Sequence, residues 1–129
     1  MAFISCTKET VEICKKRYVT SVTIFALPSG FDIVGEPDLR CDIAPLNSSY
    51  WSFPSYSVDN VSGLPITISF EENVLLSKET WSMRLVDIDL IGEDLIYQDN
   101  FDPYIDKDGT IGFKRDGVIV LTLNYTESE

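Results

Sequence analysis

The amino-acid sequence predicts an all-β domain, an antiparallel β-sandwich of about eight strands. First, the residues beyond position 18 fall into short segments in which β-branched and apolar residues alternate with polar ones. Second, glycine, proline, asparagine and aspartate separate these segments at short intervals. Third, the chain has 129 residues, of which 44% are hydrophobic and 24% charged, and this suits a single globular domain.

The N-terminal region is the only part with helical character. The segment TKETVEICKKRY, residues 7–18, begins with a threonine that can cap a helix and has a loose apolar side. We therefore expect residues 1–18 to form an N-terminal extension or short helix, and residues 19–129 to form the sandwich domain.

Seven segments have the composition and alternation of strands. They are residues 19–27, 39–45, 50–58, 64–70, 81–88, 110–115 and 118–125. Pro54 places the third segment at a sheet edge or a bend, because proline cannot donate to a strand ladder. Asp116-Gly117 predicts a tight hairpin between the last two.

The net charge of −11 narrows the classes of partner. Nucleic-acid binding is excluded, because phosphate contacts need clustered lysine and arginine, and the ten basic residues are spread thinly. No apolar run approaches the roughly 18 residues that span a bilayer, and the N-terminus has no basic leader. We expect a cytoplasmic protein or one bound peripherally to a membrane.

The chain has no histidine, and its cysteines, Cys6, Cys14 and Cys41, are scattered. Ser-His and Cys-His catalysis are therefore excluded, and neither a zinc site nor a disulfide framework is expected. We expect the cysteines to be small buried side chains. No nucleophile lies beside a carboxylate in a recognisable motif, so we expect a non-catalytic protein without a small-molecule substrate.

Two acidic stretches stand out, DIVGEPDLRCDI at residues 32–43 and LVDIDLIGED at residues 85–94. The acids concerned are Asp32, Asp38, Asp87, Asp89, Glu93 and Asp94. Both stretches occupy turns at strand ends, so their carboxylates can meet at one end of a sandwich. Each ionised pair about 5 Å apart costs roughly 3 kcal/mol at an effective dielectric near 20. Such a cluster needs protons or a cation, and oxygen ligands without nitrogen or sulfur favour calcium as the cation. The alternative is a set of ordinary solvated acidic turns.

The segments LPSGFDIVGEPDLRCDI, GLPITISFEE and WSMRLVDIDLIGEDLI resemble, in order and spacing, a C2 domain of the synaptotagmin or protein kinase C type. Such domains carry two aspartates separated by five residues, which Asp32 and Asp38 match. They later carry an aspartate-any-aspartate motif, which Asp87 and Asp89 match, followed by a further acid, for which Asp94 fits best. The final segment DGVIVLTLNY is similar to the closing strand of the family, and the resemblance covers about residues 19–125.

The resemblance implies a calcium-binding module that docks onto a membrane surface or a protein partner. The six acids would hold Ca²⁺, and the apolar residues at the loop tips, Ile33, Val34, Leu90 and Ile91, would contact the membrane or partner. These four side chains have a plainer reading, in which they pack under neighbouring loops.

Two departures from the family pattern affect this expectation. The second acidic loop is one residue shorter, so Glu93 and Asp94 compete for the last ligand position. The basic patch that many C2 domains use for phosphoinositides is missing, and its region contains only Arg40.

Two other functions are compatible with the same residues. The first is a metal-independent β-sandwich that serves as a structural or adaptor subunit of a larger assembly. The second is an acidic mimic that occupies a basic site on a partner.

Overall fold

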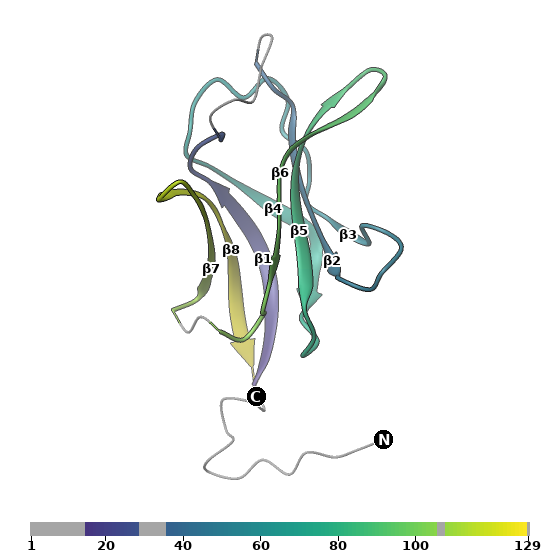
Figure 1. Cartoon of the computed structure of the whole chain (residues 1–129), viewed down its shortest axis with the longest axis vertical. Helices are drawn as coiled ribbons and strands as arrows, with labels where there is room; N and C mark the ends of the chain where they lie inside the picture. Colours follow the sequence, from purple (N-terminus) through teal and green to yellow (C-terminus); the bar gives the residue numbers. More distant parts are fainter. Residues whose placement is uncertain (1–14, 29–35, 106–107, 129) are drawn as a thin grey trace.

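The computed structural model describes residues 15–28, 36–105 and 108–128. All regular structure in these residues is β-strand, arranged as two four-stranded antiparallel sheets that face each other (Figure 1). This confirms the predicted all-β, two-sheet antiparallel architecture of a β-sandwich. None of the described segments contains a helix long and apolar enough to cross a membrane.

The first sheet has the strand order β4-β1-β8-β7, and the second has the order β3-β2-β5-β6. The strands of the first sheet are β1 (Lys16–Ile24), β4 (Ile66–Leu75), β7 (Thr110–Arg115) and β8 (Val118–Ser128). Those of the second are β2 (Leu39–Pro45), β3 (Phe53–Pro54), β5 (Trp81–Asp89) and β6 (Gly92–Phe101).

Strand β6 is an addition to the predicted elements. The segment 92–101 has four acidic or amide side chains in its last eight positions and alternates poorly, so it gives no clear strand signal. It forms a strand because β5 offers it a backbone ladder from Trp81 to Asp89. In contrast, β2 and β7 coincide with the predicted segments.

The first strand begins earlier than predicted. Residues 16–18, which the sequence analysis included in the helix-like segment, belong to β1 and pair with β8. Lys15 has no regular structure, and residues 7–14 of the predicted helix lie outside the described residues.

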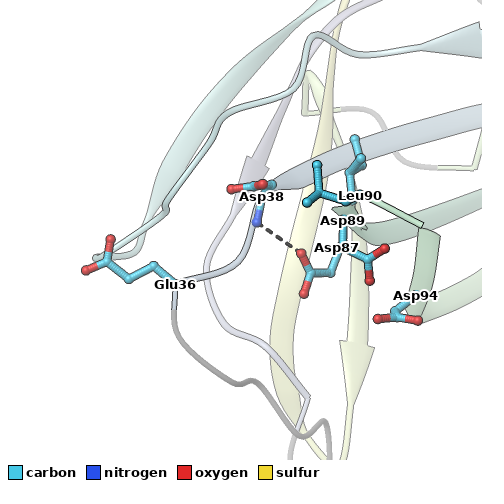
Figure 2. A pocket seen from close by; sticks show the side chains of 7 residues that line it. Glu36, Asp38, Asp87, Asp89, Leu90 and Asp94 are labelled. Carbon is cyan, nitrogen blue, oxygen red and sulfur yellow. Dashed lines mark hydrogen bonds between the residues drawn. The ribbon is translucent and has the colours of Figure 1, made fainter. Parts of the chain in front are cut away.

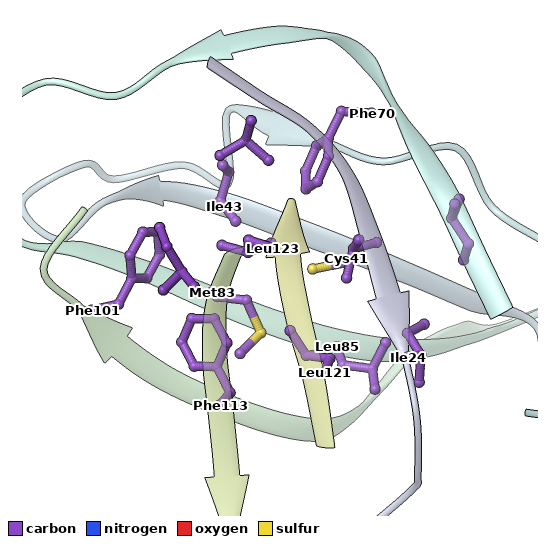
Figure 3. Packing of buried hydrophobic residues seen from close by; sticks show 14 of the residues in the cluster. Ile24, Cys41, Ile43, Phe70, Met83, Leu85, Phe101, Phe113, Leu121 and Leu123 are labelled. Carbon is purple, nitrogen blue, oxygen red and sulfur yellow. The ribbon is translucent and has the colours of Figure 1, made fainter. Parts of the chain in front are cut away.

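The core lies between the sheets, where apolar residues of both sheets point inward (Figure 3). Met83 and Leu85 of β5 face Leu121 and Leu123 of β8 in one continuous apolar cluster. Cys41 is fully buried in it, as predicted, and burial raises the pKa of its thiol. Cys6 and Cys14 lie outside the described residues.

Arg17 connects several segments at the end of the sandwich nearest the C-terminus. Its guanidinium is buried, donates to the carbonyl of Pro103 at 2.9 Å and pairs with Glu127 at 3.2 Å. It lies 4.3 Å from the ring centroid of Tyr125 and 5.1 Å from that of Tyr104. The basic run KKR therefore contributes a buried structural residue as well as surface charge.

The predicted hairpin at Asp116-Gly117 is confirmed. Both residues have positive φ, 53° and 78°, as a two-residue turn matched to twisted strands requires.

Gly117→Ala should lower the free energy of unfolding by about 1–2 kcal/mol, because an L-residue is strained at this φ. Urea unfolding measures the change. Gly112→Ala is the matched control, since Gly112 has ordinary backbone geometry and open space around it. Equal effects of the two substitutions would contradict this explanation.

Candidate functional site

The hairpin between β5 and β6 extends beyond the rest of its sheet, at the end opposite the C-terminus (Figure 1). Its two-residue tip consists of Leu90 and Ile91, and the carboxylate of Asp89 accepts a hydrogen bond from the N–H of Ile91 at 2.9 Å. Leu90 and Ile91 are 105% and 97% exposed. The alternative that these two tip residues pack under neighbouring loops is therefore wrong. Ile33 and Val34 lie outside the described residues.

A β-bulge decides which acids of the hairpin share a face. Leu85 pairs with Tyr97, but the next pair is Val86 with Leu95, so Ile96 is an extra residue on β6. Beyond the bulge Asp87 lies directly opposite Asp94.

An unbroken ladder would have given the opposite result. Continuing the register of the Leu85–Tyr97 pair would place Glu93 opposite Asp89 and would turn Asp94 to the other face. Because consecutive strand residues point to opposite faces, only one of Glu93 and Asp94 can face the other acids. The bulge selects Asp94.

Asp38 connects the first acidic stretch to this hairpin. Its backbone N–H donates to the carboxylate of Asp87 at 3.0 Å, and its carbonyl accepts from the N–H of Ile88 at 2.8 Å. Its own carboxylate accepts from the N–H of Asn60 at 2.7 Å. Within the described residues the two acidic stretches therefore meet at one end of the sandwich, as predicted. Asp32 lies outside the described residues.

A hollow of about 520 Å³ opens between these segments. It is lined by Glu36, Asp38, Asp87, Ile88, Asp89, Leu90 and Asp94. Figure 2 shows the side chains of Asp87, Asp89 and Asp94 grouped together, whereas the carboxylates of Asp38 and Glu36 point away from them. Among the described residues no group of three or more histidine, cysteine, aspartate or glutamate side chains is arranged to hold a metal ion.

Glu93 lies on the outer face of the sheet, paired with arginines. Its carboxylate accepts a hydrogen bond from Arg40 of β2 and lies 3.6 Å from the guanidinium of Arg84 of β5. In the sequence, Glu93 and Asp94 compete for the last metal-ligand position. The structure separates them, since Asp94 lines the hollow and Glu93 does not.

Both arginines are held by Asp42, a carboxylate with no exposed surface. Arg40 donates two hydrogen bonds to it, at 2.7 and 2.8 Å, and Arg84 donates one at 2.8 Å. The hydrogen bonds to Asp42 raise the pKa of Arg40, partly offset by burial. The ring of Trp51 covers Arg84, with 4.9 Å between the guanidinium carbon and the ring centroid. These contacts form a fixed charge network of Arg40, Asp42, Arg84 and Glu93.

The sequence analysis missed this network and the place of Glu36 in the hollow. One signal was present, because Arg40 and Asp42 are two residues apart on a predicted strand and must share a face. The match to Arg84 depends on the register between β2 and β5, which pairs Asp42 with Arg84. Sequence spacing does not reveal that register.

Comparison of the chain with protein-family models and with curated protein sequences gave no match. The function is therefore inferred from the geometry of this end of the sandwich and from the sequence motifs.

Asp42→Asn should lower the free energy of unfolding by about 3 kcal/mol, because two partly buried guanidinium groups lose their shared counter-charge. Urea unfolding monitored by circular dichroism measures the loss. Glu72→Gln, at an exposed position of β4, is the control and should have little effect. A loss no larger than that of the control would show that the network contributes little to stability.

Proposed function

We propose that this chain is a non-catalytic, calcium-dependent docking module that resembles a C2 domain. Calcium would bind at the acidic end of the sandwich, and the β5–β6 hairpin would then contact a membrane surface. The observation that carries the proposal is the direct cross-strand pair of Asp87 and Asp94, with Asp89 on the same face.

This arrangement of acids is electrostatically costly. Directly opposed residues of antiparallel strands have Cβ atoms about 4.5–5.5 Å apart, and like charges there are destabilising. Among the described residues, no lysine or arginine lines the hollow that these acids share with Asp38 and Glu36. A bound cation would remove the repulsion, so the ion-free protein has a standing preference for a positive partner.

The donor set decides the kind of cation. Among the described lining residues, every side-chain atom that could coordinate a cation is a carboxylate oxygen, because the other two are Ile88 and Leu90. Oxygen ligands suit calcium and magnesium rather than zinc or copper. An open hollow with ligands from separate segments favours calcium, which accepts irregular geometry and loses its waters more readily than magnesium.

Calcium binding requires rearrangement within the described residues, because no three of these carboxylates are arranged to hold an ion. The Asp38 carboxylate must turn from the N–H of Asn60 toward the group formed by Asp87, Asp89 and Asp94. That rotation exchanges one hydrogen bond for an ion contact. The sequence resemblance adds Asp32 as a further ligand.

The tip of the β5–β6 hairpin would make the contact with the membrane. Leu90 and Ile91 are exposed at the far end of the hairpin that presents the acids. Burying these two side chains would contribute about 3–6 kcal/mol, at roughly 1.5–3 kcal/mol each. With a net charge of −11 the protein is repelled by an anionic membrane until the acids near the tip are neutralised. Calcium would therefore act as the switch for docking.

A metal-independent adaptor is the second candidate function. It is favoured by the hydrogen bonds that occupy Asp38, Asp87 and Asp89, each of which accepts from a backbone N–H. In that function the acids would shape the loops, and the exposed tip would be a protein contact.

Millimolar calcium should raise the thermal midpoint of unfolding relative to chelator. Binding to the folded state alone adds about 2.7 kcal/mol at a hundredfold excess over Kd, and we expect a Kd between roughly 10 µM and 1 mM. Differential scanning fluorimetry measures the shift, and magnesium should give a much smaller one.

Asp87→Asn is the matched variant for this test. Asparagine keeps an acceptor oxygen for the N–H of Asp38 but removes the charge, so the fold should persist while the calcium effect is lost. An unchanged midpoint of the wild type at saturating calcium would support the adaptor function instead.

Substituting the tip residues, Leu90→Ala with Ile91→Ala, should reduce calcium-dependent binding to phosphatidylserine vesicles several-fold and leave calcium affinity nearly unchanged. The reason is that alanine retains the backbone of the turn but removes most of the apolar surface. Vesicle sedimentation with calcium and with chelator measures this. Val118→Ala, an exposed apolar position on β8, is the control. Wild-type protein that ignores vesicles at saturating calcium would make the tip a protein-contact surface.

A further inference from the structure

Among the described residues, the outer half of the β5–β6 hairpin has no third strand beside it. The ladder between β2 and β5 ends at the pair of Leu39 and Asp87, the N–H of Ile88 still donates to the carbonyl of Asp38, and Asp89 to Glu93 pair only within the hairpin. A two-stranded ribbon is marginally stable in water without further packing. The exposed tip buries no apolar surface that would compensate.

Glu93 supplies an attachment at the outer end of this ribbon. It is the cross-strand partner of Ile88, one pair beyond the end of the β2 ladder. Its carboxylate reaches back to Arg40 on β2 and Arg84 on β5, and so ties the ribbon to the body of the sheet.

The two arginines are held by contacts that do not involve Glu93. Asp42 holds both guanidinium groups, and Trp51 covers that of Arg84. Because these side chains are ordered by other contacts, pairing with Glu93 costs little additional side-chain entropy.

We propose that Glu93 is a positioning residue that braces the β5–β6 hairpin from its outer face and so preorganises Asp87, Asp89 and Asp94 on the inner face. This inference rests on the proposed calcium function for its purpose. The brace itself is a property of the ion-free protein and can be tested without calcium.

The two faces of β6 carry the bracing residue and the candidate ligand separately. Glu93 and its neighbour Asp94 point to opposite sides of the sheet, so the pull of the arginines on Glu93 sets the twist at which Asp94 meets Asp87. A hairpin held at that twist loses less conformational freedom when a cation is bound, and its affinity for the cation is correspondingly higher.

The first measurement is amide hydrogen exchange of calcium-free protein, followed by mass spectrometry. Glu93→Gln should speed exchange in residues 88–93 by about twofold to fivefold, the range that partly exposed ion pairs produce, with β1 and β8 unchanged. Glu71→Gln, at an exposed position on β4, removes the same charge elsewhere and should have no effect on the hairpin.

Salt provides a signature that separates the ion pair from a merely structural effect. Raising sodium chloride from about 0.05 to 0.5 M shortens the screening length. Wild-type protection of the hairpin should fall toward that of Glu93→Gln, whereas the variant should respond little.

The second measurement is calcium titration by calorimetry on the same proteins. Glu93→Gln should weaken calcium binding by about twofold to fivefold, with unchanged stoichiometry. Asp94→Asn should weaken it far more while leaving calcium-free exchange of the hairpin unaltered or slower, because a like-charge contact is removed.

The outcomes distinguish this inference from the proposed function. If no variant and no wild type binds calcium, the calcium function fails, and hydrogen exchange alone decides the brace. Unchanged exchange in Glu93→Gln overturns the brace. Unchanged exchange with a large loss of calcium affinity would make Glu93 itself a ligand. Faster exchange with unchanged calcium affinity would overturn its positioning role.

Discussion

The register change at Ile96 is the constraint on which the acidic end of this protein depends. One extra residue in β6 shifts the pairing from Leu85–Tyr97 to Val86–Leu95. It thereby reverses the faces of residues 92–95, between the bulge and the hairpin tip, relative to β5. The reversal turns Asp94 toward Asp87 and Glu93 toward the arginines. Without it the same sequence would send Glu93 to the inner face and leave both arginines with Asp42 alone.

The two faces of sheet β3-β2-β5-β6 differ in the balance of their charges. On the outer face two arginines, Asp42 and Glu93 balance to zero, and hydrogen bonds satisfy the buried carboxylate. On the inner side, where the core ends, Asp87, Asp89 and Asp94 meet, and the part of the hollow that the structure describes contains no basic residue. A neutral network stabilises the protein by itself, whereas an unbalanced cluster calls for a partner. This contrast marks the acidic end as the candidate site without use of the sequence resemblance.

A β-sandwich alone does not define a function, because the same architecture serves many unrelated tasks. The calcium function and the adaptor function share the fold and the exposed tip, and they differ in what the acids contact. In the described residues the acids accept hydrogen bonds from backbone N–H groups, and these bonds also hold Asp38 against β5. The same groups therefore contribute to the loop geometry.

The sequence by itself determined the two-sheet antiparallel class, the strands at 39–45 and 110–115 and the Asp116-Gly117 hairpin. The alternation of apolar and polar residues, the turn residues and the charges are local properties, so they can be recognised without knowing which residues are neighbours in space. Only the tertiary structure decided the existence of β6, the separation of Glu93 from Asp94 and the meeting of Arg84 with Asp42. Each of these depends on the register between strands, and a shift of one residue reverses which face a side chain occupies.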